Sequence, residues 1–119
     1  YLSKGGYLSV AERFFDRTRC THFLLEYDTE RAGDFEPLRY VPKTKGVVLG
    51  IVSTKTGELE PLDLLKRRTG EAARHLDHQR LAIGPQCGFA STVAGNPLSE
   101  DQQRAKLARL VEAARVLWP

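Results

Sequence analysis

Methionine is absent from this chain, cysteine occurs only twice, and no stretch of about 18 consecutive apolar residues is present. The missing apolar stretch excludes a transmembrane helix, and no basic segment followed by an apolar run and a cleavage site opens the chain. We therefore expect a soluble, cytoplasmic protein that does not act at a membrane. Because the chain starts at Tyr1 and has no methionine, we also expect it to be an internal piece of a longer polypeptide.

The two cysteines, Cys20 and Cys87, lie far apart in a chain without a secretion signal. A structural disulfide between them is therefore disfavoured. The net charge of +3 does not predict nucleic-acid binding, because basic residues alternate with acidic ones, as they do between residues 63 and 71.

Three short apolar runs predict β-strands at residues 21–28, 46–53 and 80–86. Each run is nearly continuous in apolar residues, which is typical of strands buried on both faces. Residues 29–45 are charged and contain Gly33, Pro37 and Pro42, so we expect a long loop there.

Helices are predicted at residues 9–17, 61–76 and 99–117. Capping-box spacings begin the first and the last, at Ser9 with Glu12 and at Ser99 with Gln102, and a proline begins the middle one. Apolar side chains at helical spacing mark the closing helix: Leu107, Leu110, Val111, Ala114 and Trp118.

Strands that alternate with helices and are buried on both faces indicate an α/β fold with parallel strands. Three strands cannot close a barrel, and an open sheet of this size would leave its edges unpaired. The pattern therefore predicts that more chain precedes this one.

Polar side chains follow each predicted strand, at the end where functional groups collect in parallel α/β folds. They are Glu26 and Asp28, then Thr54 and Lys55, then Gln86 and Cys87. A carboxylate, an amine and a thiol are thus expected on one rim. Such a set suits metal binding or nucleophilic chemistry.

Cys20, His22 and Glu26 are all residue types that bind zinc, and they share one face of the first strand. At about 3.3 Å per residue, however, Cys20 lies roughly 20 Å from Glu26 along an extended strand. We therefore expect Cys20 and His22 to be structural. His75 and His78 lie at the end of the middle helix, opposite the reactive rim, and are expected to be structural or solvent-facing.

Cys87, Glu26 and Lys55 each allow a structural and a functional interpretation. Unpaired cysteine is often a small core residue, but Cys87 follows a strand and precedes Gly88, where its sulfur can face the rim. Glu26 follows an apolar run and would be costly to bury without a cation. Lys55 is either a surface lysine or a cation aimed into the site, and its place after a strand favours the site.

Three segments together resemble cobalamin-independent methionine synthase: residues 23–38, which contain Leu-Glu-Tyr-Asp, residues 48–60, and residues 84–92, which contain Pro-Gln-Cys-Gly-Phe. The resemblance is to the C-terminal region of the short, single-barrel bacterial branch. It implies that residues 1–119 form the C-terminal portion of a TIM-type (β/α)8 catalytic domain.

The resemblance also implies a zinc cofactor. Glu26 matches the family's glutamate ligand and Cys87 matches its last cysteine ligand, whereas the His-x-Cys pair that completes the metal shell has no match and would lie just upstream of Tyr1. Lys55 stands on the strand that carries a proton-donating histidine in the full-size enzyme, and a lysine there resembles the short branch. We name Lys55 as the catalytic candidate.

Three functions remain open. The resemblance favours zinc-dependent methyl transfer to a thiol, with homocysteine as acceptor and a methylated folate as donor, in methionine biosynthesis. Alkyl transfer to another thiol, as in the related coenzyme M transferases, uses the same barrel and metal. A non-catalytic partial barrel that self-associates or binds a complementary fragment through its strand edges is the third.

Overall fold

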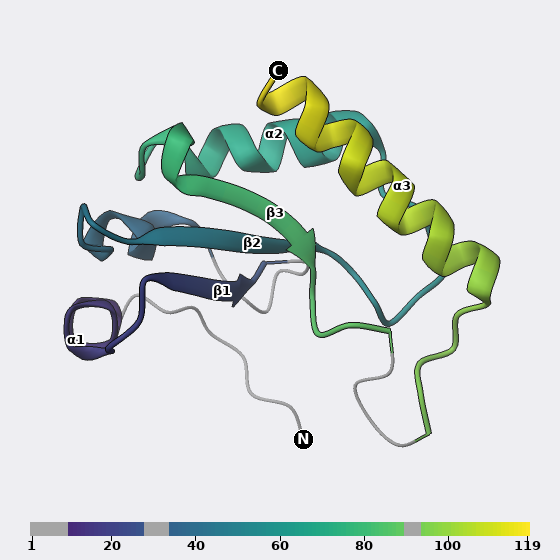
Figure 1. Ribbon diagram of the computed structural model, residues 1–119, viewed down its shortest axis with the longest axis horizontal. Helices are drawn as coiled ribbons and strands as arrows, with labels where there is room; N and C mark the ends of the chain where they lie inside the picture. The colour runs from purple at the N-terminus through teal and green to yellow at the C-terminus, as the bar shows by residue number, and fades with distance from the viewer. Residues whose placement is uncertain (1–9, 28–33, 90–93) are drawn as a thin grey trace.

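The computed structural model describes residues 10–27, 34–89 and 94–119. Helices and strands alternate along the chain in the order predicted from the sequence. They are α1 (Ala11–Arg17), β1 (His22–Glu26), η2 (Glu36–Tyr40), β2 (Gly46–Val52), α2 (Leu62–Ala72), η3 (His78–Arg80), β3 (Leu81–Pro85) and α3 (Glu100–Leu117). Figure 1 shows one sheet with α2 and α3 beyond β3 and with α1 beside the start of β1.

The three strands form a parallel sheet in the order β1-β2-β3, which confirms the predicted strand direction. Across the sheet Glu26 pairs with Gly50, and Gly50 pairs with Gly84. The register shifts between Gly50 and Val52, so that Val52 pairs with Pro85 at the end of β3. This parallel α/β sheet is compatible with part of a barrel.

Burial of β1 on both faces was a wrong prediction. Its side chains alternate, with Leu25 only 5% exposed and Leu24 76% exposed. Phe23 and Leu25 face the common core, whereas Leu24 points to the opposite face of the sheet, which has no helix against it among the described residues. A run of apolar residues predicts a strand, but it does not show which of its side chains another segment of the chain covers.

An aromatic cluster packs α1 against β1. The ring of Phe15 lies 4.9 Å from that of Phe23, edge to face, and Phe14 lies against both rings. Burial of Phe15 and Ala11 gives α1 its inner face. The helix begins after Val10, which makes no side-chain cap, and Ser9, predicted to cap it, lies outside the described residues.

Two predicted boundaries changed. The predicted loop at residues 29–45 contains the 3-10 helix η2, whose Pro37 and Leu38 join the core. The middle helix ends at Ala72 rather than at residue 76, although its buried residues Leu65, Thr69 and Ala72 belong to the predicted stripe.

The closing helix has the predicted capping box. The Ser99 hydroxyl accepts from the backbone of Gln102 at 3.1 Å, and the Gln102 side chain accepts from the backbone of Ser99 at 2.8 Å. Its buried face differs from the expected one, because Lys106, Leu110 and Ala113 are inside while Leu107 and Val111 face outward. None of the helices in the described part of the chain has the length and apolar character to cross a membrane.

Candidate functional site

The C-terminal ends of β1 and β3 bring a carboxylate and a thiol into contact. Cys87 Sγ lies 2.5 Å from Glu26 Oε1, and the amide nitrogen Nε2 of Gln86 donates to Glu26 Oε2 at 2.8 Å. Glu26 and Cys87 are both exposed, and neither cysteine of the chain is in a disulfide. The structure thus places these two predicted site residues together at one rim; Asp28, which was expected nearby, lies outside the described residues.

A glycine between the two strands makes this contact feasible. Glu26 is on β1 and Cys87 follows β3, so about two strand spacings, or 9 to 10 Å, separate their backbones. Gly50 occupies the paired position on β2 between them. A Cβ on Gly50 would lie 3.1 Å from Leu25 O and 3.4 Å from Gln86 Cα. The neighbouring backbones therefore approach Gly50 closely, which is possible because glycine has no side chain.

The thiol of Cys87 donates to Glu26 Oε1, so a proton joins the two groups in this structure. A metal ion bound by both groups would take the place of that proton. Thiolate sulfur and carboxylate oxygen are both zinc ligands.

The two side chains form only part of a metal shell. Residues 10–27, 34–89 and 94–119 contain no group of three or more histidine, cysteine, aspartate or glutamate side chains that could hold an ion. The donor types of Glu26 and Cys87 therefore fit zinc as half of a four-ligand site. The earlier argument from the cost of burying Glu26 does not apply, because its side chain is exposed.

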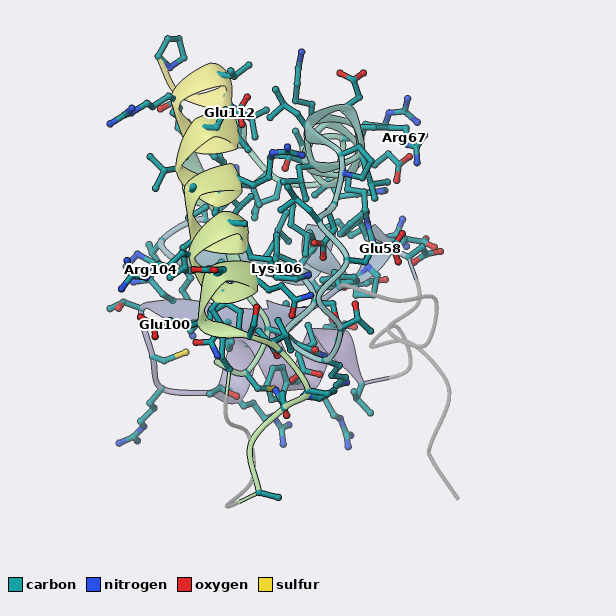
Figure 2. The ribbon with its side chains drawn as sticks, turned by 90° about the vertical axis from the view of Figure 1, so that its right-hand side faces the viewer. Glu58, Arg67, Glu100, Arg104, Lys106 and Glu112 are labelled. Atoms are coloured by element: carbon teal, nitrogen blue, oxygen red, sulfur yellow. The ribbon has the colours of Figure 1, made fainter. Side chains whose placement is uncertain are left out.

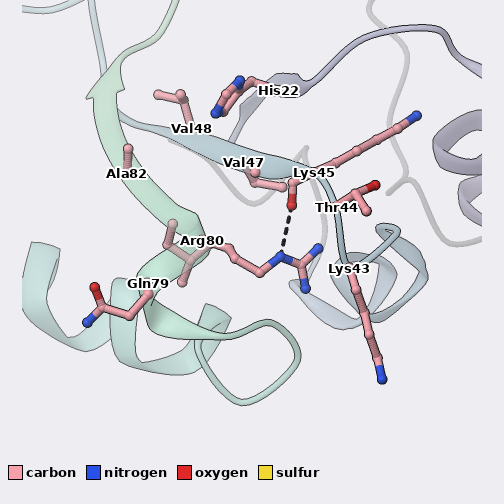
Figure 3. Close-up of a pocket in the computed structure, with 11 residues that line it drawn as sticks. His22, Lys43, Thr44, Lys45, Val47, Val48, Gln79, Arg80 and Ala82 are labelled. Atoms are coloured by element: carbon pink, nitrogen blue, oxygen red, sulfur yellow. Dashed lines mark hydrogen bonds between the residues drawn. The ribbon is translucent and has the colours of Figure 1, made fainter.

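Cys20 and His22 lie at the opposite end of the sheet. His22 is the first residue of β1 and pairs with Gly46, the first residue of β2, and Cys20 is two residues earlier. His22 borders a hollow of about 280 Å³ that Figure 3 shows near the start of the strands. The structure does not bring either residue to the Glu26–Cys87 contact.

Two basic side chains at that hollow, Lys45 and Arg80, donate hydrogen bonds to main-chain carbonyl oxygens. Arg80 donates through Nε to Lys45 O at 2.9 Å, the bond drawn in Figure 3, and through Nη2 to the carbonyls of Val41 and Pro42. The ammonium of Lys45 donates to Phe15 O and Thr18 O. These bonds fasten the start of β2 to the end of α1 and the start of β3 to the segment before β2, which is a structural role.

Lys55 lies where the sequence placed it, after the end of β2. Its backbone amide donates to Ser53 Oγ at 3.2 Å and its side chain is exposed. Among the described residues its ammonium has no hydrogen bond or ion pair. Its catalytic role stays a prediction.

The chain is similar to two proteins of Bacillus subtilis, YxjG and YxjH, whose functions are undetermined. It is 49% identical to YxjG and 45% identical to YxjH, in each case over 119 residues that make up 99% of this chain and 32% of the relative. No family model matches the chain.

Two solved structures have the same fold. A candidate vitamin-B12-independent methionine synthase of Listeria monocytogenes superposes with a TM-score of 0.76 at 34% identity, covering 97% of this chain and 33% of that one. This chain has a methionine synthase-related fold. The B12-independent methionine synthase of Shewanella sp. W3-18-1, solved in complex with selenomethionine, has a TM-score of 0.75 at 22% identity, over 93% of this chain and 30% of that one, and shows the fold alone. The chain spans about a third of the length of each of these four relatives.

A buried ion pair next to the rim was missed from the sequence. Lys106 of α3 is 0% exposed, and its Nζ lies 2.9 Å from Glu60 Oε1 and 2.6 Å from Glu58 O. Glu60 Oε2 accepts from the backbone of Ser53 at 2.6 Å. Figure 2 shows Lys106 on the inner side of α3, in contrast to Arg104. The pair holds the loop that follows β2 and carries Lys55.

Asn96 ties two rim loops together. Its Nδ2 donates to Thr54 O at 2.8 Å and to Gly88 O at 3.5 Å, so one amide joins the loop after β2 to the loop after β3.

The burial of Lys106 could have been predicted from the sequence, because Lys106, Leu110 and Ala113 recur at helical spacing. Asn96 had no such signal, since loop contacts depend on tertiary structure.

Proposed function

We propose that this chain is the C-terminal portion of a zinc-dependent thiol methyltransferase related to methionine synthase, and that Glu26 and Cys87 are two of the ligands of its metal. The observation that supports this most directly is the 2.5 Å contact between Cys87 Sγ and Glu26 Oε1 across β2. The relation to methionine synthases in fold supports homocysteine as the acceptor and a methylated folate as the donor.

A neutral thiol is a poor nucleophile and must lose its proton before it can attack a methyl group. Zinc bound at this rim would supply that deprotonation, because it would hold the substrate thiol as a thiolate near neutral pH. Cys87 contributes a soft sulfur and Glu26 a hard, more exchangeable oxygen. In this proposal the other two ligands come from outside the chain. Lys55 follows the middle strand on the same rim and would place a positive charge beside the incoming methyl donor.

Two serine variants of the full-length protein test the assignment. Cys87→Ser should lose zinc and thiol methylation together, because a hydroxyl is a far weaker zinc ligand than a thiolate. Cys20→Ser is the matched control and should keep both, since Cys20 precedes the opposite end of the strand. Elemental analysis gives the zinc content, and turnover with homocysteine gives the activity. A Cys87→Ser protein with full zinc occupancy would contradict the proposal.

The second candidate is a non-catalytic subunit, and the exposure of Leu24 on an open sheet face favours it. A partner that covers this face would bury Leu24 together with Val48. Sedimentation of the wild-type protein and of Leu24→Asp distinguishes the subunit from the enzyme. A dimer or complex that dissociates in the variant, together with a wild-type protein that contains no zinc, would support the subunit.

A further inference from the structure

We propose that Gln86 is a positioning residue for the metal ligand Glu26, an inference that rests on the proposed function. Its side-chain amide donates from Nε2 to Glu26 Oε2 at 2.8 Å. This bond occupies one carboxylate oxygen. The other oxygen, Oε1, accepts from Cys87 Sγ.

The chemistry of the pair sets the orientation of the amide. An ionised carboxylate only accepts hydrogen bonds, so the amide must present its NH₂ group to Glu26 rather than its oxygen. The oxygen Oε1 of Gln86 points the other way, is buried, and has no partner in the described part of the chain. A glutamate at position 86 would put an acceptor, and a second negative charge, against the carboxylate.

The backbone holds Gln86 in place for this task. Its amide donates to Val52 O at 3.0 Å, which continues the β2–β3 ladder one residue past β3. Its Cα lies over Gly50, where a Cβ would be 3.4 Å away. Gln86 is thus anchored to the central strand at the point where its side chain reaches Glu26.

Groups that orient a metal ligand from outside the coordination shell affect affinity strongly, and their loss commonly costs about 10- to 100-fold. Without Gln86 the carboxylate of Glu26 loses the hydrogen bond that fixes Oε2, so more of its conformational freedom is lost when the ion binds. We therefore expect Gln86→Leu, which keeps a similar size but has no donor, to bind zinc on the order of tenfold more weakly.

The test uses the full-length protein and competition with a zinc chelator, with Gln86→Leu, Gln86→Glu and Gln79→Leu compared with wild type. Gln79 lies in η3, two residues before the start of β3, so Gln79→Leu makes the same chemical change at the other end of the strand. Cobalt substitution adds a spectroscopic readout. The cobalt–thiolate absorption of Cys87 should persist in Gln86→Leu, while the visible ligand-field bands shift because Glu26 has changed its orientation.

The outcomes separate the two proposals. If wild type binds no zinc, the proposed function fails. If wild type binds zinc and Gln86→Leu binds it as tightly, with unchanged cobalt bands, the function stands and the positioning role of Gln86 is wrong. Weaker zinc binding and shifted bands in Gln86→Leu, with wild-type behaviour in Gln79→Leu and unchanged thermal unfolding of the metal-free proteins, would support it.

Discussion

Removal of the buried ammonium of Lys106 should destabilise the protein more than any other single charge deletion discussed for this chain. In Lys106→Ala the carboxylate of Glu60, only 15% exposed, loses its cation, and Glu58 O loses a donor. Deleting one partner of a buried ion pair costs about 3–5 kcal/mol, because the other charge stays buried without compensation. Since Glu60 retains some solvent contact and its bond from Ser53, we expect about 3 kcal/mol, the low end of that range.

Urea unfolding, followed by the fluorescence of Trp118 at the end of α3, measures this change in the free energy of unfolding. Arg104→Ala is the matched control on the same helix, because the Arg104–Glu100 pair is 75% and 76% exposed. An exposed pair of this kind contributes less than about 0.5 kcal/mol. The double variant Lys106→Met/Glu60→Gln removes both charges and should recover much of the lost stability.

Equal effects of Lys106→Ala and Arg104→Ala would refute the reasoning, because they would mean that burial does not strengthen the Lys106–Glu60 interaction. A loss in the double variant as large as in Lys106→Ala would refute it too. The loss would then come from the missing hydrogen bond to Glu58 O rather than from an uncompensated charge on Glu60.

Three other expectations concern the helix cap, the one-sided burial of β1 and the glycine below the site. Ser99→Ala removes the acceptor for the Gln102 backbone and should lower the free energy of unfolding by about 1 kcal/mol in urea unfolding; no change would mean that the cap is not formed. Leu25→Ala should cost about 2–5 kcal/mol, whereas Leu24→Ala in the same 119-residue chain should cost little, and equal costs would mean that both faces are covered. Gly50→Val places a branched side chain between Glu26 and Gln86, so it should weaken zinc binding in chelator competition, and tight binding would show that the space is not needed.

Periodicity and caps were sufficient for the order of helices and strands, the parallel sheet and the start of α3. These features depend on contacts within or next to each segment. Ser99 and Gln102 are three residues apart, and the polar residues after each strand could be assigned to one rim because parallel strands point the same way. The sequence therefore predicted that Glu26 and Cys87 lie on the same rim, and their role as metal ligands stays a prediction.

Tertiary structure alone decided which faces are covered and which side chains meet. Leu24 and Leu25 are the same residue type in one apolar run, yet only Leu25 is buried in the core, because burial depends on distant segments. Gln86 reaches Glu26 from 60 residues away in sequence, and Lys106 reaches Glu60 from 46, so no local pattern encodes either pairing. The sequence by itself determined the helices and strands and the sheet edge on which Glu26 and Cys87 lie, because both follow from residues close together in the chain and from the common direction of parallel strands. The geometry of the contacts depended on how the three strands and their helices pack.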